Sequence, residues 1–454
     1  MRNIVLIAID TQRADRLGCY GYHRGTSPRL DGLAAAGVAF DACWSASNFT
    51  APAFTSLFTG LYPNHHGVFH FGAQAQASPV LDCLKANGAR TGGAVTFRFF
   101  KRLLGGMWGD LEAVTDGRSA DYAKDLPHAV SDAAVEWLER HGRGGPFALF
   151  LHYDGPHMPY RLPDAHAHRF GDVPDDAVPQ DLRRVFFPQE VTAFGQQEAA
   201  GMFQVIDAVD RGRRRLDDAS RRWISDRYDD SVFYNDLEVG RVLDALKSLR
   251  LADDTIVCVI SDHGEELMDH GHLTHGGIHL YEEVIRTVAL ARGPGLPAGR
   301  RVARPVSHVQ LWPWLLRCAG ARHLPEAWAA RDLLDEDAAE PVYCVGELKT
   351  AVRHGGRKLI RRRVIPEHTP VKRLRLLAKL ALLREWGEEA YDLDRDPRER
   401  SNVAGSAPWR GELAAALDRH LSTPAPALAV SGQADLDDAE RARIEKEMKD
   451  LGYM

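Results

Sequence analysis

The sequence predicts an α/β fold: a doubly wound, mostly parallel sheet with a small antiparallel α+β subdomain at its C-terminal end. Three continuous apolar runs, at 3–9, 147–151 and 255–260, have the composition of strands. Apolar runs without alternation are typical of parallel strands that helices cover on both faces. Helical patterns at 131–140 and 231–249 separate these runs, and an alternation of strands and helices predicts a parallel sheet.

The same pattern divides the chain into a main α/β domain at 1–335, a subdomain at 336–425 and a tail helix at 426–454. Within the main domain the alternation stops at 163–227, a stretch with several prolines and the basic run Arg211–Arg215. We expect this stretch to form a helical insertion or lid near the crevice, where substrate selection often resides. The alternative is a solvated surface loop.

Short strand patterns at 341–345, 358–364 and 389–393, with a helical pattern at 409–421, predict the C-terminal subdomain. Inside it, residues 371–384 place leucines and basic residues on different faces of an expected helix. Such a helix covers the core of its own protein, lies on an anionic membrane surface, or contacts a partner such as a second copy of the chain.

Each of the three apolar runs is followed by side chains that bind cations. Asp10 follows the first, Asp154 and His157 the second, and Asp262-His263 the third. Because ligands bind beyond the carboxyl ends of parallel strands, we expect these residues to meet in one crevice. Carboxylate oxygens with an imidazole suit a divalent cation such as Mn, Zn, Mg or Ca. We predict one site, held by Asp10, Asp262 and His263; Asp154 with His157 is a candidate for a second cation.

Thr50 opens a stretch with helical spacing, and Pro52 in its first turn is compatible with a helix start. A helix N-terminus offers free N–H groups to an alkoxide or a bound phosphate. Thr50 is therefore either a helix cap or a nucleophile that also ligates the metal. The presence of Asp10 and Asp262-His263 favours the nucleophile.

Four segments resemble the sulfatase family of the alkaline phosphatase superfamily, over nearly the whole chain. They are Ile9–Gly21, Thr50–Val68, Asp154–Tyr160 and Gly271–Glu283, and the segment Tyr391–Glu399 resembles the closing hairpin of that family. The resemblance implies the fold predicted above, a divalent metal, and ester hydrolysis.

The departures from the family pattern indicate phosphoryl rather than sulfuryl chemistry. Thr50 stands where sulfatases carry the Cys or Ser that becomes formylglycine, and Thr cannot be converted in this way. Phe54 replaces an Arg, His275 a Lys, Thr11 a second ligand Asp, and His263 an Asn. An Asp-His pair and a Thr nucleophile are features of phosphodiesterase, phosphonate monoester hydrolase and phosphotransferase branches of the superfamily.

We therefore expect a metal-dependent hydrolase of small phosphate esters, phosphodiesters or phosphonate monoesters above all, with a phosphothreonine intermediate on Thr50. The resemblance gives His157 and His275 catalytic roles in binding the phosphoryl group or protonating the leaving oxygen. The substrate-binding candidates are Phe54, Arg98 and His272. Alternatives are a phosphotransferase with the same intermediate, a sulfate-ester hydrolase, and a non-catalytic binding protein on this fold.

Phe54 also predicts a substrate preference. An aromatic ring in place of Arg offers no charge to a dianion, but it offers a surface for the organic arm of a monoanionic diester. We expect diesters to react faster than monoesters unless Arg98 supplies the missing charge.

Composition restricts the setting. A net charge of −6 argues against a nucleic-acid scaffold, and six scattered Cys are expected to be reduced core thiols. Met1 lies two residues before the first strand pattern, so we expect no signal peptide. No run reaches the roughly 20 apolar residues of a spanning helix, and we expect a cytoplasmic enzyme without a transmembrane segment.

Overall fold

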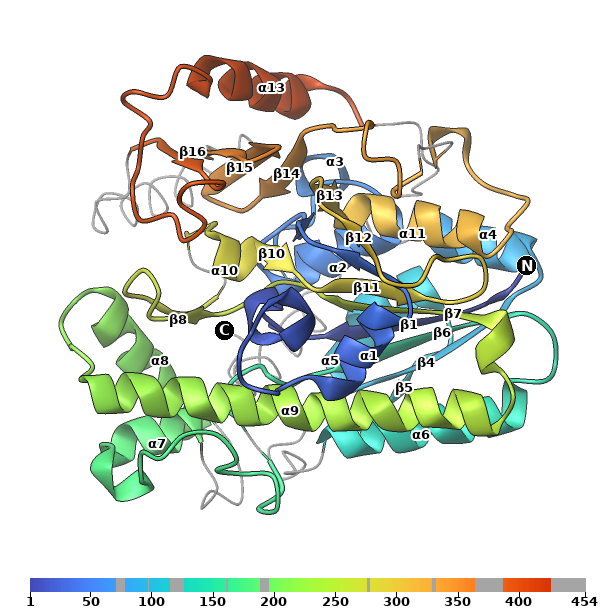
Figure 1. The fold of residues 1–454 in the computed structure, drawn as a ribbon, viewed down its shortest axis with the longest axis horizontal. Helices are drawn as coiled ribbons and strands as arrows, with labels where there is room; N and C mark the ends of the chain where they lie inside the picture. The colour runs from blue at the N-terminus through green and yellow to red at the C-terminus, as the bar shows by residue number, and fades with distance from the viewer. Residues whose placement is uncertain are drawn as a thin grey trace.

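The computed structural model describes residues 1–70, 78–96, 98–114, 126–160, 162–187, 196–275, 278–328, 332–363 and 387–425. Figure 1 shows a central sheet with helices on both faces and a smaller layer beside it that contains β14, β15, β16 and α13. The helices expected at 371–384 and 426–454 lie outside the described residues. Among the helices that are described, none has the length and apolar composition needed to cross a bilayer.

The central sheet has eight strands in the order β12-β2-β11-β7-β1-β6-β4-β5. All neighbouring pairs are parallel except those of β11, which runs antiparallel to both β7 and β2. The predicted mostly parallel α/β class is therefore confirmed. The strands are β1 (Asn3–Ile9), β2 (Val38–Phe40), β4 (Arg90–Val95), β5 (Glu112–Ala113), β6 (Phe147–Tyr153), β7 (Thr255–Ser261), β11 (Ala289–Arg292) and β12 (Arg300–Val302).

The centre of the sheet is the core of the protein. All residues of β1, β6 and β7 are buried, because helices lie on both faces (Figure 1). Helices α6 (Leu126–His141), α9 (Asp218–Ser248) and α1 (Pro28–Ala35) pack together on one face, and α2 (Thr50–Thr59) packs with α11 (His308–Cys318) on the other.

Helix α9 corrects one sequence boundary. It is a single helix that begins at Asp218, where the side chain of Asp217 accepts a hydrogen bond from the backbone N–H of Ser220 at 2.7 Å. The expected insertion limit at residue 227 therefore falls inside a helix. The charged face of the first α9 turns hid the helical pattern, because it pairs with other polar residues instead of packing on an apolar core.

The described part of the insertion contains two further helices, α7 (Gln180–Phe186) and α8 (Gln196–Asp210). The C-terminal residue of α8, Asp210, accepts a hydrogen bond from the backbone N–H of Leu273 at 3.0 Å. Leu273 belongs to the short hairpin of β8 (Glu266–Leu267) and β9 (Leu273–Thr274). The described part of the insertion thus contains helices and contacts the hairpin that follows the end of β7.

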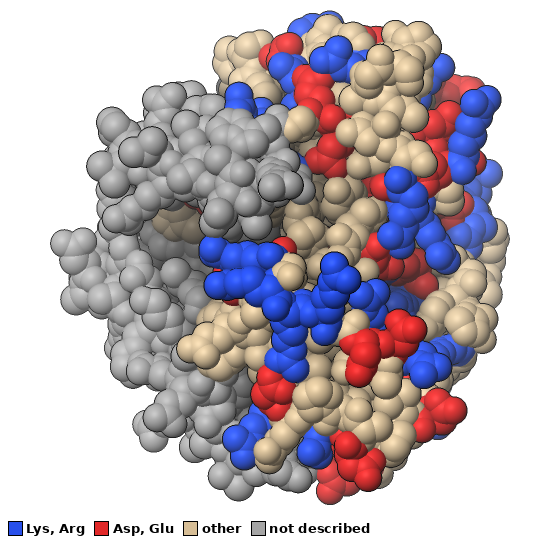
Figure 2. Space-filling model, turned by 90° about the vertical axis from the view of Figure 1, so that its left-hand side faces the viewer, with Lys and Arg blue, Asp and Glu red and all other residues tan. Residues whose placement is uncertain are grey.

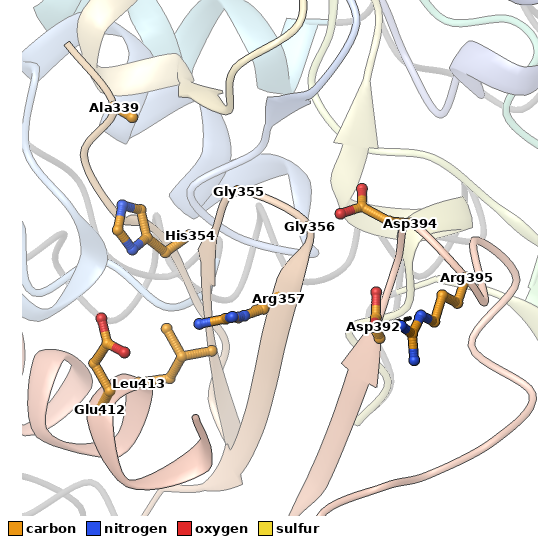
Figure 3. Close-up of a pocket in the computed structure, with 10 residues that line it drawn as sticks. All are labelled: Ala339, His354, Gly355, Gly356, Arg357, Asp392, Asp394, Arg395, Glu412 and Leu413. Carbon is orange, nitrogen blue, oxygen red and sulfur yellow. Dashed lines mark ion pairs between the residues drawn. The ribbon is translucent and has the colours of Figure 1, made fainter. Parts of the chain in front are cut away.

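The C-terminal sheet is antiparallel, with the order β14-β15-β16-β17. Its strands are β14 (Val342–Val345), β15 (Lys349–His354), β16 (Arg357–Arg362) and β17 (Glu389–Asp392), and α13 (Arg410–Ser422) packs on it. The sequence patterns did not single out β15. Figure 3 shows a cavity at one end of this sheet, between the β15–β16 turn, β17 and α13.

A substitution of Phe58 in α2 tests how much the aromatic core beside the sheet contributes to stability. Its fully buried ring contacts Trp108, Phe150 and Trp312, with ring centroids 5.1–6.3 Å apart. We expect Phe58→Ala to lower the free energy of unfolding by about 3–5 kcal/mol, because it leaves a cavity. The control is Phe203→Ala, since Phe203 is 36% exposed. Chemical denaturation of both variants measures the difference, and equal losses would contradict this account of the core.

Candidate active site

The site lies where the three central strands end. Because β1 pairs in register with β6 on one side and β7 on the other, Asp10, Asp154 and Asp262 leave the sheet at the same level. The three carboxylates are at most 7% exposed. The structure thus brings together the strand ends that the sequence indicated, at the carboxyl edge where ligands bind in such sheets.

Asp10, Asp262 and His263 offer ligand atoms that all lie within 4.8 Å of one another. Both carboxylate oxygens of Asp10 and Oδ2 of Asp262 are buried without a hydrogen-bond partner. The Nδ1–H of His263 donates to the carbonyl oxygen of Gly264 at 2.9 Å, so Nε2 keeps its lone pair. That Nε2 atom lies 3.3 Å from Oδ2 of Asp262 and 4.0 Å from Oδ1 of Asp10. Buried acceptors that converge without donors fit a hard divalent cation.

The electrostatics of the site also favour a cation. Burial raises the pKa of Asp10 well above its usual value, and the nearby charges of Asp262 and Asp154 raise it further. Burial likewise raises the pKa of Asp262 and that of Glu265 to about 8. Within the described ranges, the ion-pair partners of Asp10, Asp262 and Glu265 are histidines. A bound cation would offset the repulsion between these carboxylates.

Thr50 lies at this cluster. Helix α2 begins at Thr50, and Phe49 occupies the capping position without a side-chain cap. The Thr50 hydroxyl is fully buried, and its Oγ1 lies 3.1 Å from Nε2 of His263. Since Thr50 does not cap the helix, its position agrees better with the second interpretation of the sequence, a hydroxyl directed at the cation site.

Two further imidazoles complete the cluster. The ring centroids of His157 and His275 are 4.9 Å apart, and the ring of His275 lies 4.3 Å from that of His263. Nδ1 of His275 lies 3.1 Å from Oε1 of Glu265. Burial lowers the pKa of both His157 and His275 well below the usual value, and neighbouring imidazoles add to this. Both rings are therefore neutral at neutral pH.

Two residues of the cluster were not predicted. His152 lies in β6, fully buried, with Nε2 3.6 Å from Oδ2 of Asp10 and its ring 3.9 Å from that of Phe100. The sequence signal was an imidazole next to an otherwise apolar run, but the predicted strand ended too early, at 151. Glu265 follows His263 by two positions, and only the fold shows that its carboxylate meets His275.

The structure corrects the role expected for Phe54. This residue lies one helical turn after Thr50, but its fully buried ring packs against Phe58, Phe150 and His152 at centroid distances of 6.5, 6.0 and 5.3 Å. It belongs to the aromatic core behind the site and offers no surface to a substrate arm. The physical reason for preferring diesters therefore cannot be contact with Phe54.

The other two substrate-binding candidates have different outcomes. Arg98 opens helix α5 (Arg98–Trp108), but its side chain lies outside the described part of the structure. His272 is on the β8–β9 hairpin, where its ring centroid is 3.9 Å from that of His279 and its Nδ1 is 3.8 Å from Oδ1 of Asp210. These contacts are with the last residue of α8 and with a residue that follows the hairpin, and they do not include Asp10, Asp262 or His263.

Two strained threonines adjoin the cluster. Thr11 and Thr274 have left-handed φ angles of 55° and 71°, which β-branched residues rarely adopt. The backbone N–H of Thr11 donates to Asp262 at 3.2 Å, and its carbonyl oxygen accepts from the Tyr228 hydroxyl at 2.8 Å. Strain of about 1–3 kcal/mol per residue persists where surrounding contacts enforce it, most often at functional sites.

Comparisons with known proteins bear on the family and the fold of the chain. A family model described as Sulfatase matches residues 2–321. The chain is 24% identical to the uncharacterized sulfatase YidJ of Escherichia coli, over 88% of this chain and 82% of that protein. It is 21% identical to an N-acetylglucosamine-6-O-sulfatase of Bacteroides thetaiotaomicron, over 90% and 83%.

Solved structures show the same fold. A phosphonate monoester hydrolase of Agrobacterium radiobacter superposes with a TM-score of 0.65 at 17% identity, over 93% of this chain and 95% of that one. A protein solved in complex with its substrate D-glucosamine-2-N,6-O-disulfate superposes with a TM-score of 0.68 at 18% identity, over 92% and 97%.

Cation binding to the cluster has a direct thermal consequence. We expect Mn²⁺ or Zn²⁺ added to chelator-treated protein to raise Tm, because a ligand at 100 times its Kd stabilises the folded state by about 2.7 kcal/mol. Asp262→Asn should lose most of this rise and most of the bound metal in elemental analysis. Asp254→Asn is the control, since that carboxylate is 67% exposed and pairs with Arg2 at the surface. An unchanged Tm rise in Asp262→Asn would reject the site.

Asp210 makes stability depend on pH. Burial raises its pKa from 3.8 to about 7, so the folded protein holds this proton while the unfolded chain has lost it. The resulting stabilisation is present below pH 4 and is lost as pH rises towards 7. We expect the Tm of Asp210→Asn relative to the wild type to be higher at pH 8 than at pH 5. Thermal melts at both values check this, and a difference independent of pH would contradict it.

Proposed function

The chain belongs to the sulfatase family, and from this premise we propose that it is a metal-dependent hydrolase of phosphodiesters or phosphonate monoesters with Thr50 as nucleophile. One observation carries the proposal. The Thr50 hydroxyl lies 3.1 Å from Nε2 of His263, which forms a group of candidate metal ligands with Asp10 and Asp262. A hydroxyl in this place is suited to attack a substrate that the same group binds.

The residues present fit a divalent cation held by Asp10, Asp262 and His263. When bound, this cation would polarise the ester and make the Thr50 hydroxyl more acidic. The other residues of the cluster orient one another and transfer protons. Glu265 holds His275 through Nδ1, which fixes the ring with its other nitrogen free to face the substrate.

The reaction proceeds in two steps. Oγ1 of Thr50 forms a bond to phosphorus while the bond from phosphorus to the leaving oxygen breaks, and the hydroxyl proton passes through an imidazole, His157 or His275, to the leaving oxygen. Water then cleaves the phosphothreonine ester and returns one proton to Thr50. An acceptor alcohol in place of water would make the same site a phosphotransferase.

Charge supports a monoanionic substrate. His157 and His275 are neutral at neutral pH because burial lowers their pKa. They donate hydrogen bonds but add no positive charge. Among the described groups of the cluster, the positive charge that faces the substrate would therefore come from the cation bound by Asp10, Asp262 and His263. Phosphodiesters and phosphonate monoesters carry one negative charge, whereas a phosphate monoester carries two near neutral pH.

Sulfate esters are the second candidate, because they too carry a single negative charge. The relatives named for sulfatase activity align over more than four fifths of their length. Against this stands Thr50, which cannot become formylglycine and leaves only a plain alcohol for the attack.

Thr50 has a matched control within the same helix. We expect Thr50→Ala to lower kcat by at least about 1,000-fold, equivalent to about 4 kcal/mol of barrier, with Tm and metal content nearly unchanged. Thr59→Ala removes a hydroxyl that is equally buried in α2 but bonded to the carbonyl oxygen of Thr55, and it should stay within tenfold of the wild type. Retained activity in Thr50→Ala would exclude the proposed nucleophile.

The substrate class is decided by kcat/KM for matched p-nitrophenyl esters with Mn²⁺, Zn²⁺, Mg²⁺ and Ca²⁺. We expect the phosphodiester and the phosphonate monoester to exceed the phosphate monoester at pH 7. A sulfate ester that ranks first would replace the phosphoester proposal with the second candidate. A monoester that ranks first would mean that a further positive charge, such as Arg98 or a second cation, acts at the site.

A further inference from the structure

A second cavity, of about 480 Å³, lies beside the catalytic cluster. Its walls come from three parts of the chain: the turns at 13–23 after β1, residues 269–270 together with residues 282–286 at α10 (Glu282–Ile285), and the loop at 397–400 after β17. We propose that this cavity binds a tetrahedral oxyanion, sulfate or phosphate, either free or as a group on a larger molecule. This inference does not depend on the chemistry of Thr50.

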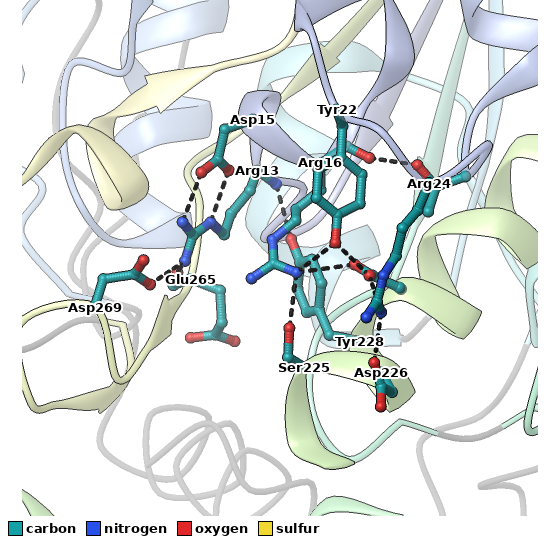
Figure 4. Close-up of polar contacts among 12 residues, drawn as sticks. Arg13, Asp15, Arg16, Tyr22, Arg24, Ser225, Asp226, Tyr228, Glu265 and Asp269 are labelled. Atoms are coloured by element: carbon teal, nitrogen blue, oxygen red, sulfur yellow. Dashed lines mark hydrogen bonds and ion pairs between the residues drawn. The ribbon is translucent and has the colours of Figure 1, made fainter. Parts of the chain in front are cut away.

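The acidic side chains of the cavity are already engaged. Asp15 and Asp269 both pair with Arg13, at 2.8 and 2.6 Å, as Figure 4 shows. Glu283 pairs with His270 at 2.5 Å. Each of these carboxylates therefore has a positive or proton-donating partner and does not repel an incoming anion as an isolated charge would.

Glu282, the fourth acidic residue of the lining, is held from outside the cavity. Its carboxylate pairs with Lys358 at 3.1 Å and with Arg353 at 2.8 Å. Although burial acts to raise its pKa, the charges of Lys358 and Arg353 outweigh burial and lower it. Glu282 thus stays ionised, but Lys358 and Arg353 compensate its negative charge. This charge therefore does not cancel the positive charge of the arginines that line the cavity.

Three guanidinium groups of the lining remain: Arg286, Arg398 and Arg400. None of them forms an ion pair with a residue that the structure describes. Nε of Arg286 donates to the carbonyl oxygen of Asp41 at 2.8 Å, and the group lies 5.6 Å from the ring of Tyr20. This side chain is therefore oriented, and its charge acts on the carboxylates of Asp15 and Glu282 in the same lining.

Arg398 and Arg400 are held at the rim by the residue between them. Glu399 is buried, has a left-handed φ of 53°, and pairs with Lys358 at 2.7 Å. Its carboxylate also accepts a hydrogen bond from the backbone N–H of Glu282 at 2.6 Å. Because this anchor fixes the loop against α10, the two flanking arginines face the cavity from a defined position.

The chemistry of the cavity selects an oxyanion. Guanidinium groups bind the oxygens of sulfate and phosphate through paired N–H groups, and three of them belong to the lining of this cavity. The volume lies in the range of roughly 300–1,000 Å³ that small-molecule sites occupy, so it accommodates an anion with an organic group attached. Figure 2 looks onto the side of the molecule where β8 and α8 lie in Figure 1, and Lys and Arg side chains form a band across the middle of that face.

The cavity shares a wall with the catalytic cluster. Nη1 of Arg13 donates to the carbonyl oxygen of Glu265 at 3.1 Å, and the Glu265 carboxylate holds His275. Gly264 packs so closely on Glu283 that an added Cβ would collide with the carbonyl oxygen of Glu283. An anion in the cavity is thus separate from the nucleophile but close to the backbone that carries the metal ligand His263.

The test is calorimetric titration of the full-length Thr50→Ala protein at constant ionic strength, with chloride as the control anion. The probes are inorganic sulfate, inorganic phosphate and a disulfated disaccharide. We expect the further double substitution Arg398→Ala/Arg400→Ala to weaken binding at least tenfold. The control is Arg395→Ala, because Arg395 is in the same loop, is 89% exposed and lies beside Asp392 at the other cavity shown in Figure 3.

Two results would overturn the inference: equal affinity in the double variant and the Arg395→Ala control, or no binding of any probe. Tight binding of the inorganic ions identifies a site for free anions, and Arg398- and Arg400-dependent binding of the disaccharide alone identifies a site for a substrate group.

Arg286→Gln provides a second variant if the double substitution lowers Tm. The double substitution in a wild-type Thr50 background should leave hydrolysis of p-nitrophenyl esters unchanged. Failure of that hydrolysis in the unmodified protein would reject the proposed function and not the cavity.

Discussion

Asp10 and Asp262 are buried with no Lys or Arg partner among the described residues, and this is the constraint on which the rest of the site depends. Two carboxylates that lie together in a desolvated place repel each other, and burial alone raises the pKa of both. Such an arrangement persists where a cation compensates it or where the surrounding fold holds it firmly. Here the fold does hold it, through the paired ends of β1 and β7 and the strained backbone of Thr11.

An ion network fixes the turn that carries the first of these carboxylates. Figure 4 shows Arg13, Arg16 and Arg24 directed at acidic residues, and outside their own turn these residues belong to two segments, α9 and the β8–β9 hairpin. Arg16 and Arg24 both reach Asp229 of α9, at 3.1 and 3.0 Å, while Arg13 reaches Asp269 in the turn between β8 and β9. The network explains why the early turns of α9 are charged although they are largely buried. It also joins the turn after β1 to the hairpin that precedes His275.

The site differs from the sulfatase pattern because neutral side chains stand at two positions where that pattern has charged ones. The sulfatase pattern resembled by this chain has an Arg where Phe54 stands and a Lys where His275 stands. Phe54 lies in an aromatic core against Phe150 and His152. A charged side chain at this position would be buried away from solvent, and these neighbouring rings carry no carboxylate that could pair with it. His275 is kept neutral by burial and by His263. In the function that we propose, compensation of the substrate charge would therefore depend more heavily on a cation than it does in a site with Arg and Lys.

The sequence by itself determined the central strands, the helix that starts at Thr50, and the meeting of Asp10, Asp262 and His263. These features follow from local patterns, because an apolar run specifies a buried strand and parallel strands end at one edge. Only the tertiary structure decided that Phe54 faces the core, that His152 lies against Asp10, and that Glu265 holds His275. The antiparallel direction of β11 and the basic cavity were decided there too. Each of these features depends on contacts between residues far apart in the chain. Helical or strand periodicity predicts which face of an element is buried, but it does not predict which distant side chain packs against that face.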